Sequence, residues 1–558
     1  MTKSAAVIDS VWFNGDVYTM NAAMPTAQAF AVSAGKYVAL GTNDEILALC
    51  QPATRKVDLV GRFIMPGLID THLHGIWGGL RDLFEAYVGF TADIAKLLAA
   101  VRAHAAKAAP GQWINGGPWY MRDIEQLGQS PRLLLDQHSP LHPVALQDAT
   151  YHSLWVNSVA LQVCGITRDT PDPIGGRIGR DPSSGEPDGI LFESAQGLVR
   201  AFSGASSAQL DQALVYMRGY FHSLGIVGFK EAMAYEDLLR AYASADRANA
   251  LDLHAAMHLA RKPLNAAEQV PYETLERWRS QYRSAHVHTG FIKLFLDGVA
   301  PSRTAAFFEP YVSCTGCDPS QAERLAHDPD RQLLIAPDEL NRELIEMDRR
   351  GFVVKMHAVG DRAARAGLDA IAAARAANGD SGLRHEIGHC AFVIEADHPR
   401  FRVLNAVAEM SPRLWFPNPV TPGQYAVLGK ARTNRCHQIR SLMDAGAELT
   451  YGSDWPAAAA DPNPWMGLAG MVTRRHPGGL FEGAVGPEQA ITLERALPLF
   501  TSNAARALGL EQVTGSLSVG KSADFVALEH SIFGATPREI AETKPLQTVF
   551  EGRIVFER

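Results

Sequence analysis

The middle of this 558-residue chain repeats one pattern, in which a short apolar segment ends on a polar residue and a helical segment follows. Alternation of this kind predicts parallel strands joined by crossover helices. Eight such strands predict an α/β fold, a (β/α)8 TIM barrel closed on itself. The first predicted strand ends at His74, and the others cover residues 225–231, 252–258, 290–297, 351–357, 383–389, 402–410 and 447–454. Helical periods fill the gaps, for example at residues 339–349 and 361–376.

Both ends of the chain have a different sequence pattern, in which short apolar runs flank tight turns such as Asn14-Gly15. Because domain termini often lie close together, we expect one small, split β-sandwich domain from residues 1–62 and 510–558, with the barrel at 63–509. The interval 75–204 is too long for one crossover and is rich in Pro, Gly and Trp. It is expected to be an insertion after barrel strand 1 that roofs the active site, because that strand end is the active-site face.

Composition excludes several classes of function. The chain carries 52 basic and 60 acidic side chains without a long basic run, which argues against nucleic acid as a partner. No apolar stretch approaches the ~18 residues of a membrane span, and the start lacks a signal-peptide core. We therefore expect a cytoplasmic protein that acts on a small molecule and uses no membrane. The sequence leaves a homo-oligomer open.

Six cysteines in so long a chain do not make a disulfide framework. Cys314 and Cys317 have the spacing of a zinc ribbon or a redox motif, but no second Cys-x-x-Cys pair accompanies them. A structural or incidental role is expected for both.

Two histidines, His72 and His74, end the first predicted barrel strand. Residues two apart in a strand face the same side, with Cα atoms roughly 6.5–7 Å apart. Two imidazoles so placed can reach one metal ion, each at about 2.0–2.1 Å. A hydrogen-bonded polar histidine is the alternative at each position. The pair is therefore half of a candidate metal site.

Other predicted strands also end on ionisable residues, namely His357, His389 and Asp454. Side chains at the carboxyl ends of barrel strands point into one common mouth, so residues distant in sequence can meet there. His385 and His389 face the same side but lie about 13 Å apart along the strand, so they cannot share one ion. His389 is the candidate ligand, and His385 is expected to be a hydrogen-bonded interior residue. Asp454 has an alternative role as a helix cap.

Lys293 lies in the apolar segment from Phe291 to Leu296. A buried ammonium needs a partner or loses its charge. Carboxylation by CO₂ would convert Lys293 to a carbamate whose two oxygens can bridge two metals. The alternatives are a salt bridge with an acid such as Glu231 or Asp297, or a side chain that points outward.

The chain resembles the metal-dependent amidohydrolase superfamily in the order of its candidate residues, which are His72, His74, Lys293, His357, His389 and Asp454. The resemblance extends over nearly the whole chain and is strongest to the long-chain branch that includes N-substituted formamide deformylases. It rests on the segments Met65-Pro66-Gly67-Leu68-Ile69-Asp70-Thr71-His72-Leu73-His74, Lys293–Gly298 with Arg303-Thr304-Ala305-Ala306, His357–Ala363, Gly452-Ser453-Asp454-Trp455-Pro456, Thr501–Arg506 and Gly515–Phe525.

The resemblance implies a distorted barrel with a split sandwich. It implies metal ligands at His72, His74, His357, His389 and Asp454, with Lys293 as a carbamate ligand. The metal would be Zn²⁺, as one or two ions, with other divalent metals left open. His152, within a segment that matches the family, would face the pocket as an oxyanion donor. We expect Trp77, Trp119, Arg303 and Trp415 to bind substrate, and packing of the insertion is the alternative for the tryptophans.

Three segments depart from the family pattern. Gly388 stands where a glutamate usually precedes the strand-six histidine, and Phe229-Lys230-Glu231-Ala232 replaces a His-Asp-Ala-Gly run. The segment from Ser411 to Trp415 lacks the histidine usual after strand seven. None of these positions is a predicted ligand, so the departures bear on the substrate.

The predicted reaction is hydrolysis of an amide-type C–N bond in a small, partly aromatic or apolar substrate. A zinc ion held by these residues would act as a Lewis acid and would lower the pKa of a water toward about 7, so that this water can attack the carbonyl. Asp454, a catalytic residue in this scheme, would move the proton to the leaving amine, and His152 would polarise the carbonyl. A metal-dependent hydrolase of an ester, carbamate or lactone is the first alternative, and a non-catalytic barrel scaffold is the second.

Overall fold

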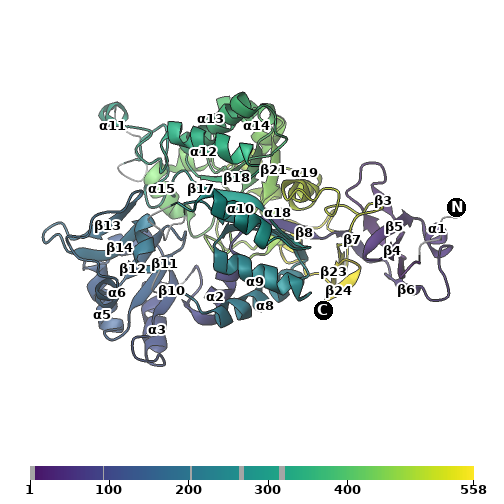
Figure 1. Ribbon diagram of the computed structural model, residues 1–558, viewed down its shortest axis with the longest axis horizontal. Coiled ribbons are helices and arrows are strands. Elements are labelled where there is room, and N and C mark those ends of the chain that lie inside the picture. Colours follow the sequence, from purple (N-terminus) through teal and green to yellow (C-terminus); the bar gives the residue numbers. More distant parts are fainter. Residues whose placement is uncertain (1–6, 92, 201–203, 263–268, 313–320) are drawn as a thin grey trace.

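A computed structural model describes residues 7–91, 93–200, 204–262, 269–312 and 321–558. A barrel lies at the centre of the molecule, with a second α/β region on one side and a β-sandwich on the other (Figure 1). Cys314 and Cys317 lie outside the described residues. Among the described residues, no helix is both long and apolar enough to cross a membrane.

The barrel is one sheet of eight parallel strands within the described chain, in the order β21-β20-β19-β18-β17-β16-β15-β8. The two outer strands meet, because the Thr71 hydroxyl donates to the Tyr451 carbonyl at 2.8 Å and the Asp454 N–H donates to the His72 carbonyl at 2.7 Å. The predicted barrel is therefore confirmed. Its strands are β8 (Leu68–Leu73), β15 (Ile226–Ala234), β16 (His254–Ala260), β17 (Val287–Phe295), β18 (Val353–Ala358), β19 (Glu386–His389), β20 (Val407–Met410) and β21 (Glu448–Tyr451).

Helices cover the barrel strands and connect them. The helices predicted at residues 339–349 and 361–376 are present as α12 and α13. The helices of this region are α2 (Gly75–Phe84), α8 (Ser207–Ser223), α9 (Glu236–Arg247), α10 (Tyr272–Gln281), α11 (Gln321–Ala326), α12 (Pro337–Arg349), α13 (Asp361–Asn378), α14 (His398–Val403), α15 (Thr421–Leu428), α16 (Lys430–Thr433), α17 (Ile439–Asp444), α18 (Pro464–Thr473), α19 (Leu493–Phe500) and α20 (Ser502–Ala507).

Two strand predictions need correction. The first half of the predicted strand 402–410 belongs to α14 and a turn, and β20 begins only at Val407. Residues 63–66, which the sequence assigned to the barrel, form a separate strand, β7 (Phe63–Pro66), which pairs with β2 and β22 of the sandwich. The chain passes from sandwich to barrel at Gly67, where a Cβ atom would lie 2.4 Å from the Val227 side chain. Only glycine fits so close to β15, and this glycine lies between the end of β7 and the start of β8.

The β-sandwich combines both ends of the chain, as the sequence predicted. One sheet has the order β5-β4-β1-β6 and the other β24-β23-β22-β7-β2-β3. Aromatic rings fill the space between them, with Trp12 and Phe30 each packed against Phe525 at centroid distances of 5.1 Å. The elements are β1 (Ser10–Phe13), β2 (Asp16–Tyr18), β3 (Thr26–Ala27), β4 (Ala29–Ser33), β5 (Lys36–Gly41), α1 (Asn43–Leu47), β6 (Arg55–Asp58), β7, β22 (Phe525–Leu528), α21 (Pro537–Ala541), β23 (Gln547–Phe550) and β24 (Arg553–Glu557).

The long segment after the first barrel strand forms a sheet of its own, in the order β13-β14-β12-β11-β10-β9, with its own apolar core. It begins after α2, which packs on the barrel beside α8. The elements are β9 (Ala86–Tyr87), α3 (Ile94–Ala105), β10 (Ile114–Trp119), α4 (Met121–Glu125), α5 (Pro131–His138), β11 (Val144–Asp148), β12 (Ser153–Val156), α6 (Ser158–Val163), β13 (Gly176–Arg180), β14 (Pro187–Glu193) and α7 (Gly197–Arg200).

Histidines join the sandwich to the barrel. His286, just before β17, lies 2.7 Å from Asp246 of α9 and 3.1 Å from Glu551 in the turn between β23 and β24. His254 of β16 lies 2.9 Å from Asp524, beside β22. These pairs fix the sandwich against the end of the barrel at which the strands begin.

Candidate metal centre

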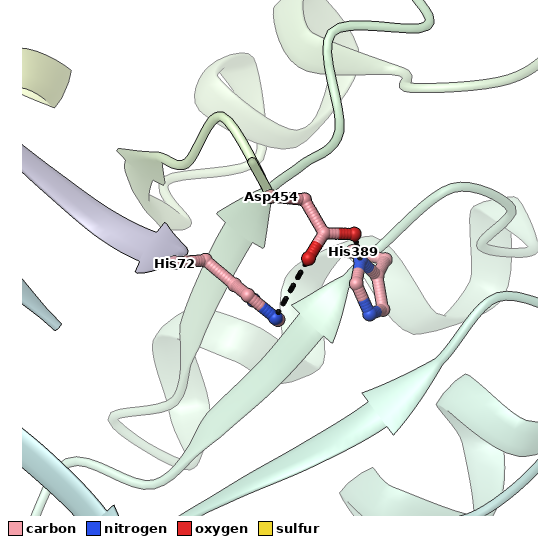
Figure 2. Close-up of side chains that lie close together, drawn as sticks. All are labelled: His72, His389 and Asp454. Carbon is pink, nitrogen blue, oxygen red and sulfur yellow. Dashed lines mark ion pairs between the residues drawn. The ribbon is translucent and has the colours of Figure 1, made fainter. Parts of the chain in front are cut away.

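The residues that the sequence singled out as metal ligands come together at the carboxyl ends of the barrel strands. Three of them, His72 of β8, His389 of β19 and Asp454 after β21, have candidate ligand atoms within 4.8 Å of one another. Figure 2 shows the three side chains converging from separate strands. The His72 Nε2 lies 3.5 Å from Asp454 Oδ1, and the His389 Nδ1 lies 3.9 Å from Asp454 Oδ2.

The other three predicted ligands surround this group. His74 is the residue before α2, and its Nε2 lies 3.6 Å from Asp454 Oδ1. The Lys293 Nζ of β17 lies 3.4 Å from His72 Nε2. The His357 Nδ1 of β18 lies 2.9 Å from His389 Nε2. All six side chains therefore share one region, although they are spread over almost 400 residues of sequence.

Two of these residues have an unusual backbone. His389 has φ of 71° and Asp454 has φ of 59°, in the left-handed region. Both lie where a buried strand stops, so the change of φ turns the chain away from the sheet direction. Non-glycine residues held in this region are uncommon and occur often at functional sites.

Each imidazole of the group is oriented by a second contact. The His72 Nδ1 contacts the Glu409 carboxylate of β20, and the His389 Nδ1 lies 3.0 Å from the Ser411 hydroxyl. The His357 Nε2 lies 3.2 Å from the Gly298 carbonyl. Such contacts fix the ring orientation of metal-binding histidines.

The His74 Nδ1 lies 3.5 Å from Glu231 Oε1 of β15, within ion-pair distance but without a hydrogen bond between the two atoms. The other Glu231 oxygen accepts hydrogen bonds from the Gly75 N–H and the Tyr242 hydroxyl, at 3.0 and 2.8 Å. Glu231 was considered above as a salt-bridge partner of Lys293, and the structure pairs it with His74.

Asp297, the other acid considered for Lys293, organises backbone instead. Its carboxylate accepts the N–H groups of Ala306, Val359 and Gly360 at 2.8–3.0 Å. Burial raises the pKa of Asp297 to about 7.

His385 is hydrogen bonded in the interior, to Asp348 at 2.9 Å, as predicted.

The environment favours neutral imidazoles. Burial holds the pKa values of His72, His357 and His389 well below the usual value, and nearby positive groups act in the same direction. A neutral imidazole is the form that binds a metal. His74 differs, because Asp454 and Glu231 more than offset burial and raise its pKa.

The donor set fits a divalent metal. Imidazole nitrogens with a carboxylate oxygen are a combination found in zinc and other divalent-metal hydrolases. The ligand atoms of His72, His389 and Asp454 are close enough to bind one ion, and the orienting contacts lie on the opposite ring atoms of His72 and His357. The residues at this site therefore fit the divalent metal ion that the sequence predicted.

Buried charges lie directly beneath this group, inside the barrel. The Glu386 carboxylate contacts the Lys230 ammonium and lies 3.2 Å from the Lys355 Nζ. Burial lowers the pKa of Lys230 to about 8. Burial and the nearby Lys355 lower the pKa of Lys293 to about 7. Lys293 is therefore a lysine whose neutral form is accessible near neutral pH.

The departure at Gly388 lies beside Glu409 of the neighbouring strand. A Cβ atom there would lie 3.5 Å from Glu409 Oε2 and 3.4 Å from the Lys355 side chain. Glu409 of the neighbouring strand thus occupies the space beside Gly388, where it contacts His72 and accepts the His389 N–H at 3.2 Å. A carboxylate is present at this place, but it comes from β20.

His152 reaches the metal centre from the inserted sheet. It immediately precedes β12, and its ring centroid lies 5.0 Å from that of His357. The His152 Nδ1 lies 2.7 Å from Glu193 Oε2. Burial lowers the pKa of His152, but Glu193 more than offsets this and raises it above the usual value. Its protonated form donates from both ring nitrogens.

The predicted substrate-binding residues have different surroundings. Trp77 of α2 is half-buried and stacks on His74 at a centroid distance of 5.1 Å. Trp119 and Trp415 pack inside the protein, which is the alternative given for the tryptophans from sequence, and their contact with substrate stays a prediction. Trp119 is buried against Trp155 and donates to the Leu146 carbonyl, and Trp415 is buried and donates to the Gly467 carbonyl. Arg303 is exposed and donates to the Val312 carbonyl.

A small cavity opens onto the metal centre, with His152, His357, His389 and Asp454 in its wall. Apolar side chains, including Val299, Pro301, Leu414 and Val420, form much of the remaining wall. A second cavity lies beside Trp77, between the barrel and the inserted sheet. His152 shows that the inserted segment contributes to the site.

Comparison with known proteins agrees with this geometry. Residues 55–556 match the model of the amidohydrolase family. The chain belongs to the amidohydrolase family. It is therefore a hydrolase, and the predicted family is confirmed.

Full-length relatives show similar levels of identity. The chain is 29% identical to Protein LONG AFTER FAR-RED 3 of Arabidopsis thaliana, over 100% of this chain and 93% of that protein. It is 28% identical to the N-substituted formamide deformylase of Arthrobacter pascens, over 99% and 98%. It is 27% identical to the putative amidohydrolase YtcJ of Bacillus subtilis strain 168, over 98% and 99%.

Solved structures share the fold. An uncharacterized metal-dependent hydrolase from Pyrococcus horikoshii superposes with a TM-score of 0.71 at 21% identity, and the match covers 98% of this chain and 100% of that one. A second, from Pyrococcus furiosus, gives a TM-score of 0.68, also at 21% identity, over 95% and 99%.

Proposed function

We propose that this amidohydrolase uses a divalent metal to cleave an amide-type C–N bond in a small substrate with an apolar or aromatic part. The observation that carries the proposal is the convergence of His72, His389 and Asp454, with His74, His357 and Lys293 around them. These side chains come from five strands of one barrel, and the imidazoles of His72, His357 and His389 each contact a partner outside the group.

The metal would be held by His72, His74, His357, His389 and Asp454, with zinc as the expected ion and one or two ions bound. A bound divalent ion supplies a Lewis acid that lowers the pKa of water and polarises a carbonyl oxygen. Lys293 is proposed to bind as its carbamate. Attack on CO₂ requires a neutral amine, and the pKa of Lys293 is lowered to about 7.

Asp454 is proposed as the residue that moves the proton. Its carboxylate lies among His72, His74 and His389 and also lines the cavity. It can therefore accept a proton from the attacking water and donate it to the nitrogen of the departing amine. The Asp454 backbone is left-handed, and its Oδ1 lies 3.5 Å from the His72 Nε2 of β8.

His152 is proposed to stabilise negative charge on the carbonyl oxygen. It lies beside His357 in the cavity wall, and Glu193 fixes its Nδ1. The raised pKa leaves Nε2 as a donor while Nδ1 is paired with Glu193. A donor fixed in place before reaction costs little reorganisation when charge develops.

The assignment to an amide-type bond draws on the relative named as an N-substituted formamide deformylase. The apolar side chains in the cavity wall, Val299, Leu414 and Val420 among them, favour a substrate with an apolar or aromatic part. Trp77 is retained as a proposed substrate contact on the side of His74.

The test is a substrate screen on metal-replete protein whose metal content has been measured. N-formyl and N-acyl derivatives of arylalkyl amines are incubated with the enzyme, and the released amine is quantified. We expect turnover of members of this set and loss of turnover after chelation, with recovery when zinc is restored. If the enzyme hydrolyses matched esters but not the amides, the proposed bond type is wrong and an ester bond takes its place. If the protein is active without metal, the proposed metal centre is wrong.

A further inference from the structure

The cavity beside the metal centre is lined by four histidines, and the proposed function gives no role to the fourth, His437. His437, in the turn before α17, lines this cavity and is fully buried. Neither of its ring nitrogens has a hydrogen-bond partner within the described part of the chain. Buried polar atoms are nearly always paired, so two unpaired atoms on one ring require an explanation.

The backbone holds His437 firmly in place. Its N–H donates to the Ala391 carbonyl at 2.7 Å, and its own carbonyl accepts from the Arg474 guanidinium at 3.0 Å. Arg474 is itself buried and also donates to the carbonyls of Cys436 and Val485. The ring packs edge-on against Trp415 at a centroid distance of 5.5 Å. The imidazole is therefore positioned by its surroundings while its nitrogens remain unpaired.

A second polar side chain of the same cavity wall is also without a partner. Gln424 of α15 is 5% exposed, and its side-chain amide makes no hydrogen bond to the described residues. An amide of this kind offers both a donor and an acceptor. The rest of the cavity wall outside the metal centre is largely apolar, and among described residues no Lys, Arg or Glu lines it.

We propose that His437 and Gln424 bind an uncharged hydrogen-bonding group of the substrate, such as a carboxamide or hydroxyl, carried on its apolar part. This inference rests on the proposed function and names a part of the substrate other than the reacting bond.

The chemistry of the two side chains selects an uncharged group. Burial, together with Arg474, lowers the pKa of His437 to about 3, so its ring offers one donor and one acceptor. A carboxamide offers both a donor and an acceptor, so it can pair with a ring nitrogen of His437 and with the Gln424 amide. A carboxylate would leave the acceptor nitrogen unpaired, and an ammonium would leave the donor unpaired and lose its own hydration.

Binding of small probes to the metal-loaded protein tests this without hydrolysis. Dissociation constants of benzamide, toluene, benzoate and benzylamine are measured by ligand-observed NMR for wild type, His437→Leu and Gln424→Met. We expect either substitution to weaken benzamide relative to toluene by about ten-fold, the cost of losing partners for a buried polar group. Benzoate bound at the metal centre would be insensitive to both substitutions.

His437→Asn serves as the conservative variant, since asparagine keeps a donor and an acceptor and tolerates the φ of 49° at this position. It should retain most of the preference for benzamide. His398→Leu is the matched control. His398 is a buried histidine that also has an unpartnered nitrogen among the described residues, but it does not line this cavity.

The inference is overturned if benzamide does not bind wild type, or if both substitutions leave the benzamide-to-toluene ratio within two-fold of wild type. Failure of the proposed function is recognised separately, in the hydrolysis screen. If the protein cleaves no amide, but substitution of His437 abolishes benzamide binding, then the inferred binding site stands and only the proposed reaction is wrong.

Discussion

The metal centre and the two polar residues His437 and Gln424 lie in the wall of one cavity, but their hydrogen bonding differs. At the metal centre, His72 contacts Glu409, His389 contacts Ser411 and His357 contacts the Gly298 carbonyl. At His437, the backbone is fixed, but neither ring nitrogen has a partner in the described chain.

This difference separates two tasks. A catalytic group must keep its geometry with or without substrate, so the protein supplies the orienting contacts itself. A recognition group discriminates when its polar atoms are satisfied only by the correct ligand. Substitutions at the metal centre should therefore change rate and metal affinity for all substrates, whereas those at His437 should change the preference among substrates.

Asp454→Asn should have the largest effect. Asparagine tolerates the φ of 59° at this position, so the fold should be kept. The amide cannot accept the proton, and turnover should fall by about 10³-fold or more. Single-turnover kinetics on protein of verified metal content provide the measurement. Undiminished rates in pure variant protein would remove Asp454 from the proton path.

His152→Phe should have the next largest effect, a decrease in kcat of about 10²-fold, because it removes one donor to the developing oxyanion. Metal content should be unchanged, since His152 lies in the inserted sheet and pairs with Glu193. A similar decrease in kcat for every amide tested is expected. A change confined to KM would assign His152 to substrate binding instead.

Glu409→Gln should weaken metal binding by about 10–100-fold, because Glu409 orients His72 and accepts the His389 N–H. Competition with a fluorescent chelator measures this affinity. Glu448→Gln is the control, since Glu448 pairs with Arg384 and Arg506 at the other end of the barrel strands. Equal metal affinities of both variants would show that Glu409 does not support the centre.

His286→Gln should have the smallest effect, one on stability alone. Hydrogen bonds to Asp246 and Glu551 raise the pKa of His286 to about 10, above the unfolded value near 6.5. The stability contributed by its charge is therefore fully present below about pH 6.5 and is lost as the pH rises through about 10.

The Tm difference between wild type and His286→Gln, on the order of 1 °C because the pair is partly exposed, should shrink from pH 6 to pH 10. The exposed His530→Gln variant serves as the control. A Tm difference that stays constant over this range would show that the His286 charge does not link the sandwich to the barrel.

Much of the fold and of the site was readable from sequence because both depend on local pattern. A strand of period two placed His72 and His74 on one face, and the rule that barrel strands end at one rim brought His357, His389 and Asp454 to the same place. The strand predicted at 402–410 failed in its first half, where α14 continues to Val403. Its apolar residues suit a buried helix as well as a strand, and period alone does not separate the two.

The partners of the ligands could not be read in this way. Glu409 lies 337 residues from His72, and no spacing relates the two. Glu409 lies beside Gly388, a position that in sequence is only a departure from the family pattern. The packing roles of Trp119 and Trp415 were likewise hidden, because a tryptophan that packs and one that binds substrate look the same in sequence.

The sequence by itself determined the alternation of strands and helices, the split sandwich and the identity of the residues at the strand ends, because each follows from the chemistry of a short segment. The tertiary structure alone decided which acids orient which histidines and which buried nitrogens remain unpaired. Those properties depend on distances between segments hundreds of residues apart. A hydrogen bond of about 3 Å is lost when its donor and acceptor move apart by far less than the length of a residue.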